Sequence, residues 1–236
     1  IGLAARTEST PHGYRTRLAS PARWPKVSLV IPTRDALGLV RQCIESIVAL
    51  STYPDYEILL VDNGSTDPEA LRYFAELREQ PGFRVLRDDG EFNYAALNNA
   101  AVAQARGEVV ALINNDIEVI TPDWLEEMVA IALQPDVGAV GAKLLYPDGT
   151  VQHAGVVLGI GGIAGHAHKH LPRVEGGYFN RAQLIQSFEA VTAACLVVRK
   201  AVYEQVGGLD AAHLKISYND IDFCLRLREA GYRNVW

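Results

Sequence analysis

The sequence predicts an α/β protein with a mostly parallel central sheet and helices on both faces. From residue 27 onward, short apolar runs alternate with segments in which apolar residues recur at helical spacing. The connecting segments are ten or more residues long, which is what parallel strands require. Several apolar runs also end abruptly in polar residues, and ligands bind beyond the carboxyl ends of strands in such sheets. We therefore expect a binding site along that edge.

The elements are expected in the following order. The first strand covers residues 27–31 and ends at Pro32, and a helix follows over residues 40–48. A strand at 58–61, a helix at 71–77, a strand at 83–86, an Ala-rich helix at 95–105 and a strand at 108–113 complete the first half. After about residue 145 we expect strands at 151–158 and 191–198, a short helix at 199–206 and a closing helix capped by Asn219. This second half is expected to extend one domain.

Composition narrows the class of protein. The net charge of −6 argues against a general nucleic-acid binder. No uninterrupted apolar run approaches the roughly 20 residues of a membrane span. The three cysteines are far apart among apolar neighbours, so we expect buried free thiols in a reducing cytoplasm. Neither GxGxxG after the first strand nor GxxxxGK[ST] occurs, which argues against a dinucleotide dehydrogenase and a P-loop phosphotransferase.

The two ends of the chain suggest a segment of a longer polypeptide. The chain begins at Ile1, without Met, and ends at Trp236, where another strand has just begun. Residues 1–26 are rich in Arg, Thr, Ser and Pro and are expected to form a linker or N-terminal arm. We expect residues 27–236 to be the functional domain, truncated at its C-terminus.

Two polar motifs follow predicted strands, and each allows two interpretations. "VDNGSTD" can be an Asn-Gly turn, or it can present Asp62 to a ring N–H of a pyrimidine base. "INND" can be a polar strand exit, or it can bind a metal ion and a diphosphate, with Asp116 giving charge and Asn114 a neutral oxygen or a ribose contact. The turn at residues 33–35 reaches the same edge of the sheet.

Two further motifs lie in the second half. In "YNDID", Asp220 and Asp222 can simply complement the dipole of the last helix, or Asp220 can act as a general base. "GHAHKH" places His166, His168 and His170 on one side if the segment is extended. These histidines can bind a metal, contact substrate or face solvent, and the surrounding glycines indicate a mobile loop.

Four segments in order resemble the catalytic domain of glycosyltransferase family 2, which has the GT-A fold. They are "SLVIPTRD", "LLVDNGSTD", "FNYAALNNAAVAQARGEVVALINNDIEVITPDWLEEM" and "YNDIDFCLRLREAGYR", and the resemblance runs from Val27 to the end of the chain. "VGAVGAKLLYPDGTVQHAGVVLGIGGIAGHAHKH" further resembles bacterial members that build O-antigen and other surface polysaccharides, some of them rhamnosyltransferases. The resemblance implies a central sheet with an acceptor-side extension.

The resemblance also implies roles for residues. It predicts inverting, Mn²⁺- or Mg²⁺-dependent transfer from a UDP- or dTDP-linked sugar to a hydroxyl of a glycan or lipid-linked glycan. Asp220 is the expected base and Asp116 the metal ligand. The nucleotide-binding residues implied are Pro32, Thr33, Asp35, Asp62, Asn93, Asn98, Asn114 and Asn115, and the loop expected at the acceptor or donor sugar carries His153, His166 and His168.

Two departures from the family pattern motivate an alternative. The metal triplet, Asn114-Asn115-Asp116, has Asn where the family has its first Asp, and Asn219 stands where the family usually has Glu. The alternative is a non-catalytic domain of the same fold that binds a nucleotide sugar or glycan within a larger assembly protein. A sugar nucleotidyltransferase is disfavoured because "IPTRDALG" lacks a Gly-rich, Arg-containing loop. We expect a location in the cytoplasm or at the inner face of the membrane, with peripheral attachment through flanking regions.

Overall fold

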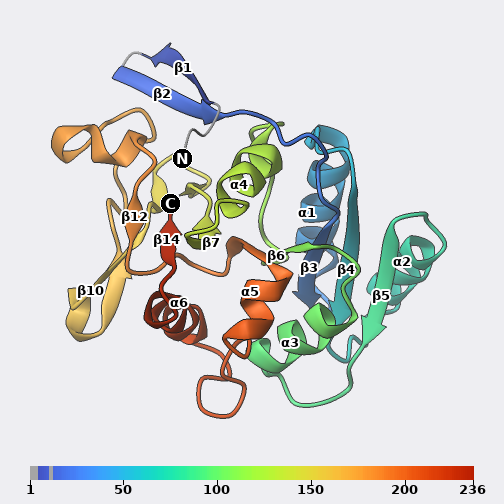
Figure 1. Ribbon diagram of the computed structural model, residues 1–236. Helices are drawn as coiled ribbons and strands as arrows, with labels where there is room; N and C mark the ends of the chain where they lie inside the picture. The colour runs from blue at the N-terminus through green and yellow to red at the C-terminus, as the bar shows by residue number, and fades with distance from the viewer. Residues whose placement is uncertain (1–4, 11–12) are drawn as a thin grey trace.

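The computed structural model describes residues 5–10 and 13–236 and confirms the α/β prediction (Figure 1). Its centre is an eight-stranded sheet. Strands β3, β4, β5 and β6 are parallel, as are β7 and β14, whereas β13 is antiparallel to both β6 and β7. The strand order is β12 (Ser187–Phe188), β14 (Arg233–Val235), β7 (Val137–Gly141), β13 (Cys195–Arg199), β6 (Val109–Ile113), β3 (Val27–Thr33), β4 (Tyr56–Asp62) and β5 (Phe83–Arg87).

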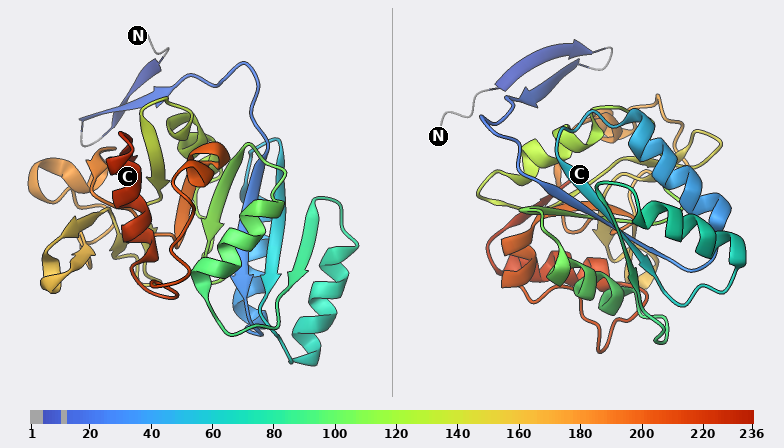
Figure 2. Two further views of the ribbon diagram at one scale, coloured as in Figure 1. Left: turned by 60° about the horizontal axis from the view of Figure 1, so that its bottom comes forward. Right: turned by 90° about the vertical axis from the view of Figure 1, so that its right-hand side faces the viewer.

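Helices cover both faces of this sheet (Figure 2, right). One face carries α1 (Leu37–Leu50), α2 (Pro68–Arg78) and α4 (Trp124–Ala132), and the other carries α3 (Tyr94–Gln104), α5 (Lys200–Gln205) and α6 (Asn219–Glu229). Successive side chains of a strand point to opposite faces, so Leu29 and Ile31 pack on the first side while Val30 packs on the second. The central strands β3, β6 and β7 are therefore buried on both faces, and the fold has two hydrophobic clusters.

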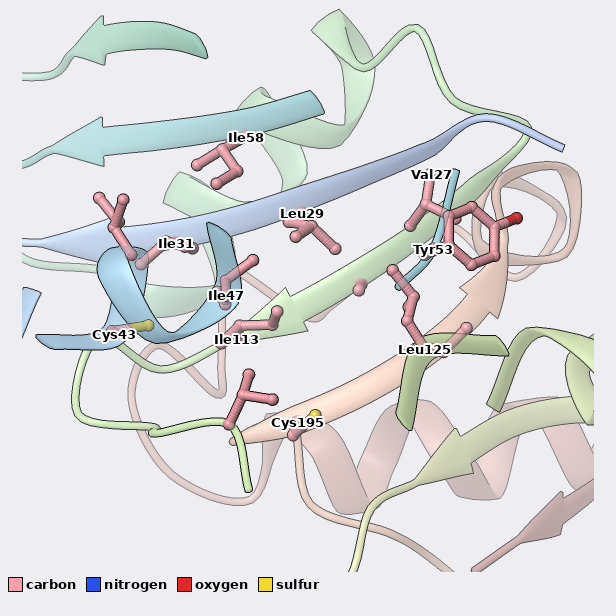
Figure 3. Packing of buried hydrophobic residues seen from close by; sticks show 14 of the residues in the cluster. Val27, Leu29, Ile31, Cys43, Ile47, Tyr53, Ile58, Ile113, Leu125 and Cys195 are labelled. Atoms are coloured by element: carbon pink, nitrogen blue, oxygen red, sulfur yellow. The ribbon is translucent and has the colours of Figure 1, made fainter. Parts of the chain in front are cut away.

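Figure 3 shows the packing on the first side. Leu29 of β3, Ile47 of α1 and Ile113 of β6 are each at most 1% exposed, and Cys195 of β13 lies beside them. Burying one such leucine or isoleucine contributes about 1.5–3 kcal/mol. The three cysteines are buried and unpaired, as predicted. This packing fixes where each strand ends and so where the polar turns lie.

Gly107, just before β6, is a position where the backbone of β3 approaches too closely for a side chain. A Cβ there would lie 2.6 Å from Ser28 N, 2.7 Å from Val109 O and 2.8 Å from Lys26 O. Backbone atoms cannot move aside, so we expect Gly107→Ala to lower the unfolding free energy by at least about 1–3 kcal/mol in urea titrations. The matched control is Gly38→Ala in α1, where a Cβ meets nothing within 4 Å. A Gly107→Ala variant as stable as Gly38→Ala would contradict this account.

The second half differs from the prediction in three places. The strand expected over residues 151–158 is two short strands, β9 (Val151–His153) and β10 (Val156–Leu158), because the chain bends at Gly155, which has a φ of 92°. The strand expected from residue 191 begins only at Cys195. Asn219 is the first helical residue and not the cap, since the N-cap position belongs to Tyr218 with a φ of 63°. Short elements complete this half: β8 (Leu144–Leu145), β11 (Ala164–His166) and the 3-10 turns Ile160–Gly162 and Tyr178–Gln183.

The segment expected to be a linker or arm contains an antiparallel hairpin, β1 (Ala5–Thr10) and β2 (Gly13–Leu18). The hairpin stands apart from the central sheet (Figures 1 and 2). Arg15 and Arg17 donate to Glu127 of α4 at 2.8 and 2.6 Å, and Arg17 also pairs with Asp123. Residues 1–4 and 11–12 lie outside the described chain. Within the described residues, no helix has the length and apolar character needed to cross a membrane.

Candidate active site

The carboxyl ends of β3, β4 and β6 meet at one edge of the sheet, as the sequence predicts. Side chains join the turns that follow these strands. Asn115 Nδ2, after β6, donates to Thr33 Oγ1 at the end of β3 at 2.9 Å. Ser65 Oγ, after β4, accepts from the backbone N–H of Asp35 at 2.7 Å. The polar residues predicted from three separate motifs therefore form one connected surface.

Two carboxylates on this surface are held within its turns. The buried Asp62 accepts from Ser65 N–H at 2.9 Å and from Arg87 Nη1 at 2.6 Å. Asp35 Oδ1 accepts from the backbone N–H groups of Asp67 and Thr66, and these bonds hold the pKa of Asp35 below its usual value. The turn interpretation of "VDNGSTD" is thus correct, and the contact of Asp62 with a base stays a prediction. The sequence motifs did not indicate that Arg87 would donate to Asp62.

The triplet after β6 presents oxygen atoms to solvent. Asp116 is exposed and makes no hydrogen bond or ion pair with the described residues. The backbone N–H of Asn114 donates to Ala194 O at 3.0 Å, which ties the triplet to the start of β13. No cluster of three or more His, Cys, Asp or Glu side chains suited to a metal occurs within residues 5–10 and 13–236. The triplet itself therefore offers a metal ion one carboxylate, that of Asp116, and the amide oxygens of its two asparagines.

Asp220 lies in the first turn of α6, where it faces the start of β13. Its Oδ2 accepts from the backbone N–H of Ala193 at 3.1 Å. The preceding Tyr218 adopts a left-handed conformation, which is sparsely populated for a residue with a side chain. Such backbone positions cluster at functional sites. The turn at Tyr218 brings the carboxylate of Asp220 into the cleft described next.

A cleft of about 350 Å³ brings Asp220 together with Asn114, the first residue of the triplet. Asn114 and Asp220 both line it, although more than 100 residues separate them in the chain. Phe92 and Tyr218, each about half exposed, supply aromatic surface at its walls. The other lining residues are Tyr94, Val156, Ala164, Gly165, His166, Thr192, Ala193, Ala194, Ile216, Ser217, Asn219 and Ile221.

The predicted histidines do not form one face. His166 ends β11 and is the histidine among the described lining residues of the cleft. The chain then turns, with positive φ at His168 and His170, so the extended arrangement that would align them is absent there. His170 stacks on Tyr146 at 5.2 Å. His153, which lies in the core, is fully buried, and burial first and then the nearby His166 lower the pKa of His153 to about 3.

The two asparagines expected near a nucleotide have structural partners. Asn93 caps α3, with Oδ1 accepting from Ala96 N–H and Nδ2 donating to Ala211 O. Asn98 is fully buried and donates to Tyr94 O at 2.8 Å. Pro32 is likewise buried within β3. Asn93 and Asn98 therefore stabilise α3 and its contacts, and in this conformation Asn98 offers no surface to a ligand.

Sequence reasoning missed the segment from Thr192 to Ala194, just before β13. Its backbone makes three hydrogen bonds. Ala193 N–H donates to Asp220, Ala194 O accepts from the N–H of Asn114, and Thr192 N–H donates to His153 Nε2 at 3.4 Å. Tyr94 Oη donates to Ala193 O at 3.1 Å and fixes the segment from α3. The sequence "VTAAC" looks like the beginning of a buried strand, so no side-chain signal could have revealed these contacts.

The sheet with its inserted antiparallel β13, and the polar cleft at its carboxyl edge, define the GT-A class of glycosyltransferase folds. The mannosyltransferase PcManGT from Pyrobaculum calidifontis, solved in complex with GDP-Man and Mn²⁺, superimposes with a TM-score of 0.65 at 20% identity, covering 91% of this chain and 55% of that one. The sequence model described as "Glycosyl transferase family 2" matches residues 28–206. The chain belongs to glycosyltransferase family 2.

Two bacterial relatives resemble nearly the whole chain. The protein y4gI of Sinorhizobium fredii is 54% identical over 232 residues, which are 96% of this chain and 25% of that protein. The O-antigen biosynthesis protein RfbC of Myxococcus xanthus is 43% identical over 235 residues, which are 97% of this chain and 18% of that protein. The chain thus spans a quarter or less of these relatives, and the expected resemblance to O-antigen proteins is confirmed.

Proposed function

We propose that this domain transfers a sugar, with inversion, from a UDP- or dTDP-linked donor to a hydroxyl of a growing surface glycan. The observation that carries the proposal is the shared cleft, which both Asp220 of α6 and Asn114 of the triplet after β6 line. A base on one side and a diphosphate-binding edge on the other is the arrangement that a single displacement at the anomeric carbon needs. A covalent intermediate would need a carboxylate nucleophile of its own.

The donor would bind along the turns after β3 and β4. Asp62, fixed by Ser65 N–H and Arg87, keeps lone pairs that suit a ring N–H of a pyrimidine. Asp35 and Thr33 belong to the same hydrogen-bonded surface and would contact base and ribose. The surface is held in place before the donor arrives, which reduces the entropy lost on binding.

The oxygen atoms of the triplet suit a hard divalent cation. Asp116 has no protein partner among the described residues, and Asn114 and Asn115 add neutral amide oxygens. Mg²⁺ or Mn²⁺ is commonly bound by one or two carboxylates, with substrate phosphates and water completing the shell. The residues therefore fit the metal, with Asp116 as its anionic ligand. When bound, the cation would offset the negative charge that develops on the leaving diphosphate.

The acceptor would enter from the side of Asp220. Ala193 N–H holds one carboxylate oxygen, which orients the group for taking the proton of the attacking hydroxyl. Phe92 and Tyr218 offer apolar faces on which a sugar ring can lie. RfbC is named for O-antigen biosynthesis, which supports a surface glycan as the acceptor class.

Calorimetric titration with UDP and dTDP tests the donor assignment. Each nucleotide is titrated with Mn²⁺, with Mg²⁺ and with EDTA, because the diphosphate is expected to bind through the metal at Asp116. We expect binding that EDTA abolishes and that prefers one of the two bases. Equal binding with EDTA would contradict the metal assignment, and no binding would contradict the donor site in this chain.

A non-catalytic binding domain is the alternative, favoured by the single carboxylate of the triplet and by Asn219 beside Asp220. It predicts metal-dependent binding of the intact donor with neither transfer nor donor hydrolysis. Following release of the diphosphate from a UDP- or dTDP-sugar, in a chain extended beyond Trp236, separates the two functions.

A further inference from the structure

Two histidines connect the core to the cleft. His153 on β9 is fully buried, and His166 on β11 lines the cleft. Their Nδ1 atoms are 2.8 Å apart and the two rings are nearly perpendicular, at 85°. At this distance one Nδ1 must donate a proton and the other must accept it. The direction of this hydrogen bond decides which nitrogen of His166 carries a proton.

A backbone N–H sets the direction. The N–H of Thr192 lies 3.4 Å from His153 Nε2 and can only donate, so His153 Nε2 must be the unprotonated nitrogen. A neutral imidazole then carries its proton on Nδ1, which donates to His166 Nδ1. The proton of His166 is thereby placed on Nε2. That atom makes no hydrogen bond with the described residues.

The same contact resists protonation of His166. An imidazolium at His166 would direct a second N–H at His153 Nδ1, which already carries a proton. Burial lowers the pKa of His166, Lys169 acts in the same direction, and the nearby Asp220 opposes both. A charged His166 would also stabilise the carboxylate of Asp220 and weaken it as a base. His153 therefore keeps His166 uncharged beside Asp220, the proposed base, and leaves the Nε2–H of His166 as a hydrogen-bond donor.

We propose that His166 binds the acceptor as a neutral imidazole, donating from Nε2 to a hydroxyl oxygen of the acceptor glycan next to Asp220, with His153 as the positioning residue that fixes this tautomer. The assignment of the bound group as the acceptor rests on the proposed function. The tautomer of His166 does not rest on the proposed function, so the tautomer and the acceptor contact can be disproved separately.

Ring nitrogen chemical shifts test the tautomer without any substrate. The protein is labelled with ¹⁵N-histidine, and the signals of His166 are assigned by their loss in His166→Gln. At pH 7 we expect His166 to be protonated on Nε2 alone. In His153→Leu, which has no donor, His166 should exchange between the two neutral tautomers, whereas His153→Asn, whose amide can replace Nδ1–H, should keep the fixed form. A proton on His166 Nδ1, or an imidazolium at pH 6.5 in the unmodified protein, would overturn the proposal even if His153→Leu did not fold.

Kinetics test the acceptor contact. Loss of one neutral hydrogen bond in His166→Ala should raise KM for the acceptor about 3- to 10-fold, with KM for the donor unchanged. His166→Gln, whose amide reaches the position of Nε2, should recover most of that loss. His213→Ala, on an exposed histidine paired with Asp210, is the control and should leave both constants as they were. A rise in the KM of the donor instead would place His166 on the other substrate and overturn the assignment.

Discussion

Asp220→Asn is expected to reduce sugar transfer by about 10²- to 10⁴-fold, the usual contribution of a positioned general base. Asparagine has nearly the same shape and its Oδ1 can still accept from Ala193 N–H, so the cleft should keep its form. It cannot take a proton from the incoming hydroxyl. Donor binding should be unchanged because Asp35, Asp62 and Asp116 of the proposed donor site lie at the ends of β3, β4 and β6, whereas Asp220 lies in α6. Single-turnover transfer and calorimetric binding of the nucleotide, measured on the same preparation, check both parts.

Asp222→Asn is the matched control for this variant. Asp222 lies in the same turn of α6 and loses the same charge, but it pairs with Arg226 at 2.7 Å and does not line the cleft. We expect nearly full transfer activity from it. Equal losses in the two variants would mean that the charge at the helix N-terminus matters, and the assignment of Asp220 as base would then be wrong.

Asp116→Asn is expected to weaken metal-dependent binding of UDP or dTDP by at least about 10- to 100-fold, since loss of even an outer-shell partner of a metal has effects of this size. The substitution removes the negative charge from a side chain that has no protein partner among the described residues, so the fold should be unaffected. Titration with Mn²⁺ at several concentrations, followed by thermal unfolding without metal, distinguishes lost affinity from lost stability.

Glu118→Gln provides the comparison two residues away. Glu118 is exposed and accepts from Gln42 Nε2 at 2.7 Å, so this variant removes one surface charge without touching the triplet. Nucleotide affinity should stay within about twofold, because exposed charges are screened by salt. If Asp116→Asn binds as tightly as Glu118→Gln, the metal is held by other groups and the triplet is only a strand exit.

The parallel part of the fold was predictable because its signals are local. Apolar runs such as residues 27–31 and 58–61 are buried on both faces, so their burial appears directly in the sequence. β13 was predicted as a strand, but its antiparallel direction depends on contacts with β6 and β7 that no local pattern encodes. The pairing of β1 with β2 was missed because these polar strands form beside α4, to which β2 is joined by ion pairs.

The candidate site was predictable where side chains carry the chemistry. Asp62, Asp116 and Asp220 each stand at the end of an element, and the structure brings the latter two motifs to one cleft through Asn114 and Asp220. The burial of Asn98 was not predictable, since the sequence does not show whether an amide on a helix faces solvent or the core. The partnership of His153 with His166 required knowing that β10 and β11 fold back on each other. Only the tertiary structure supplies that information.

The direction of β13 decides which backbone groups reach the cleft. β13 starts at the edge where β6 and β7 end, because it is antiparallel to both of them. The segment that leads into β13 therefore crosses this edge, and its N–H groups at Thr192 and Ala193 donate to His153 Nε2 and to the carboxylate of Asp220. If β13 ran in the other direction, the chain would enter it from the opposite edge of the sheet, and these two backbone donors would not reach the cleft.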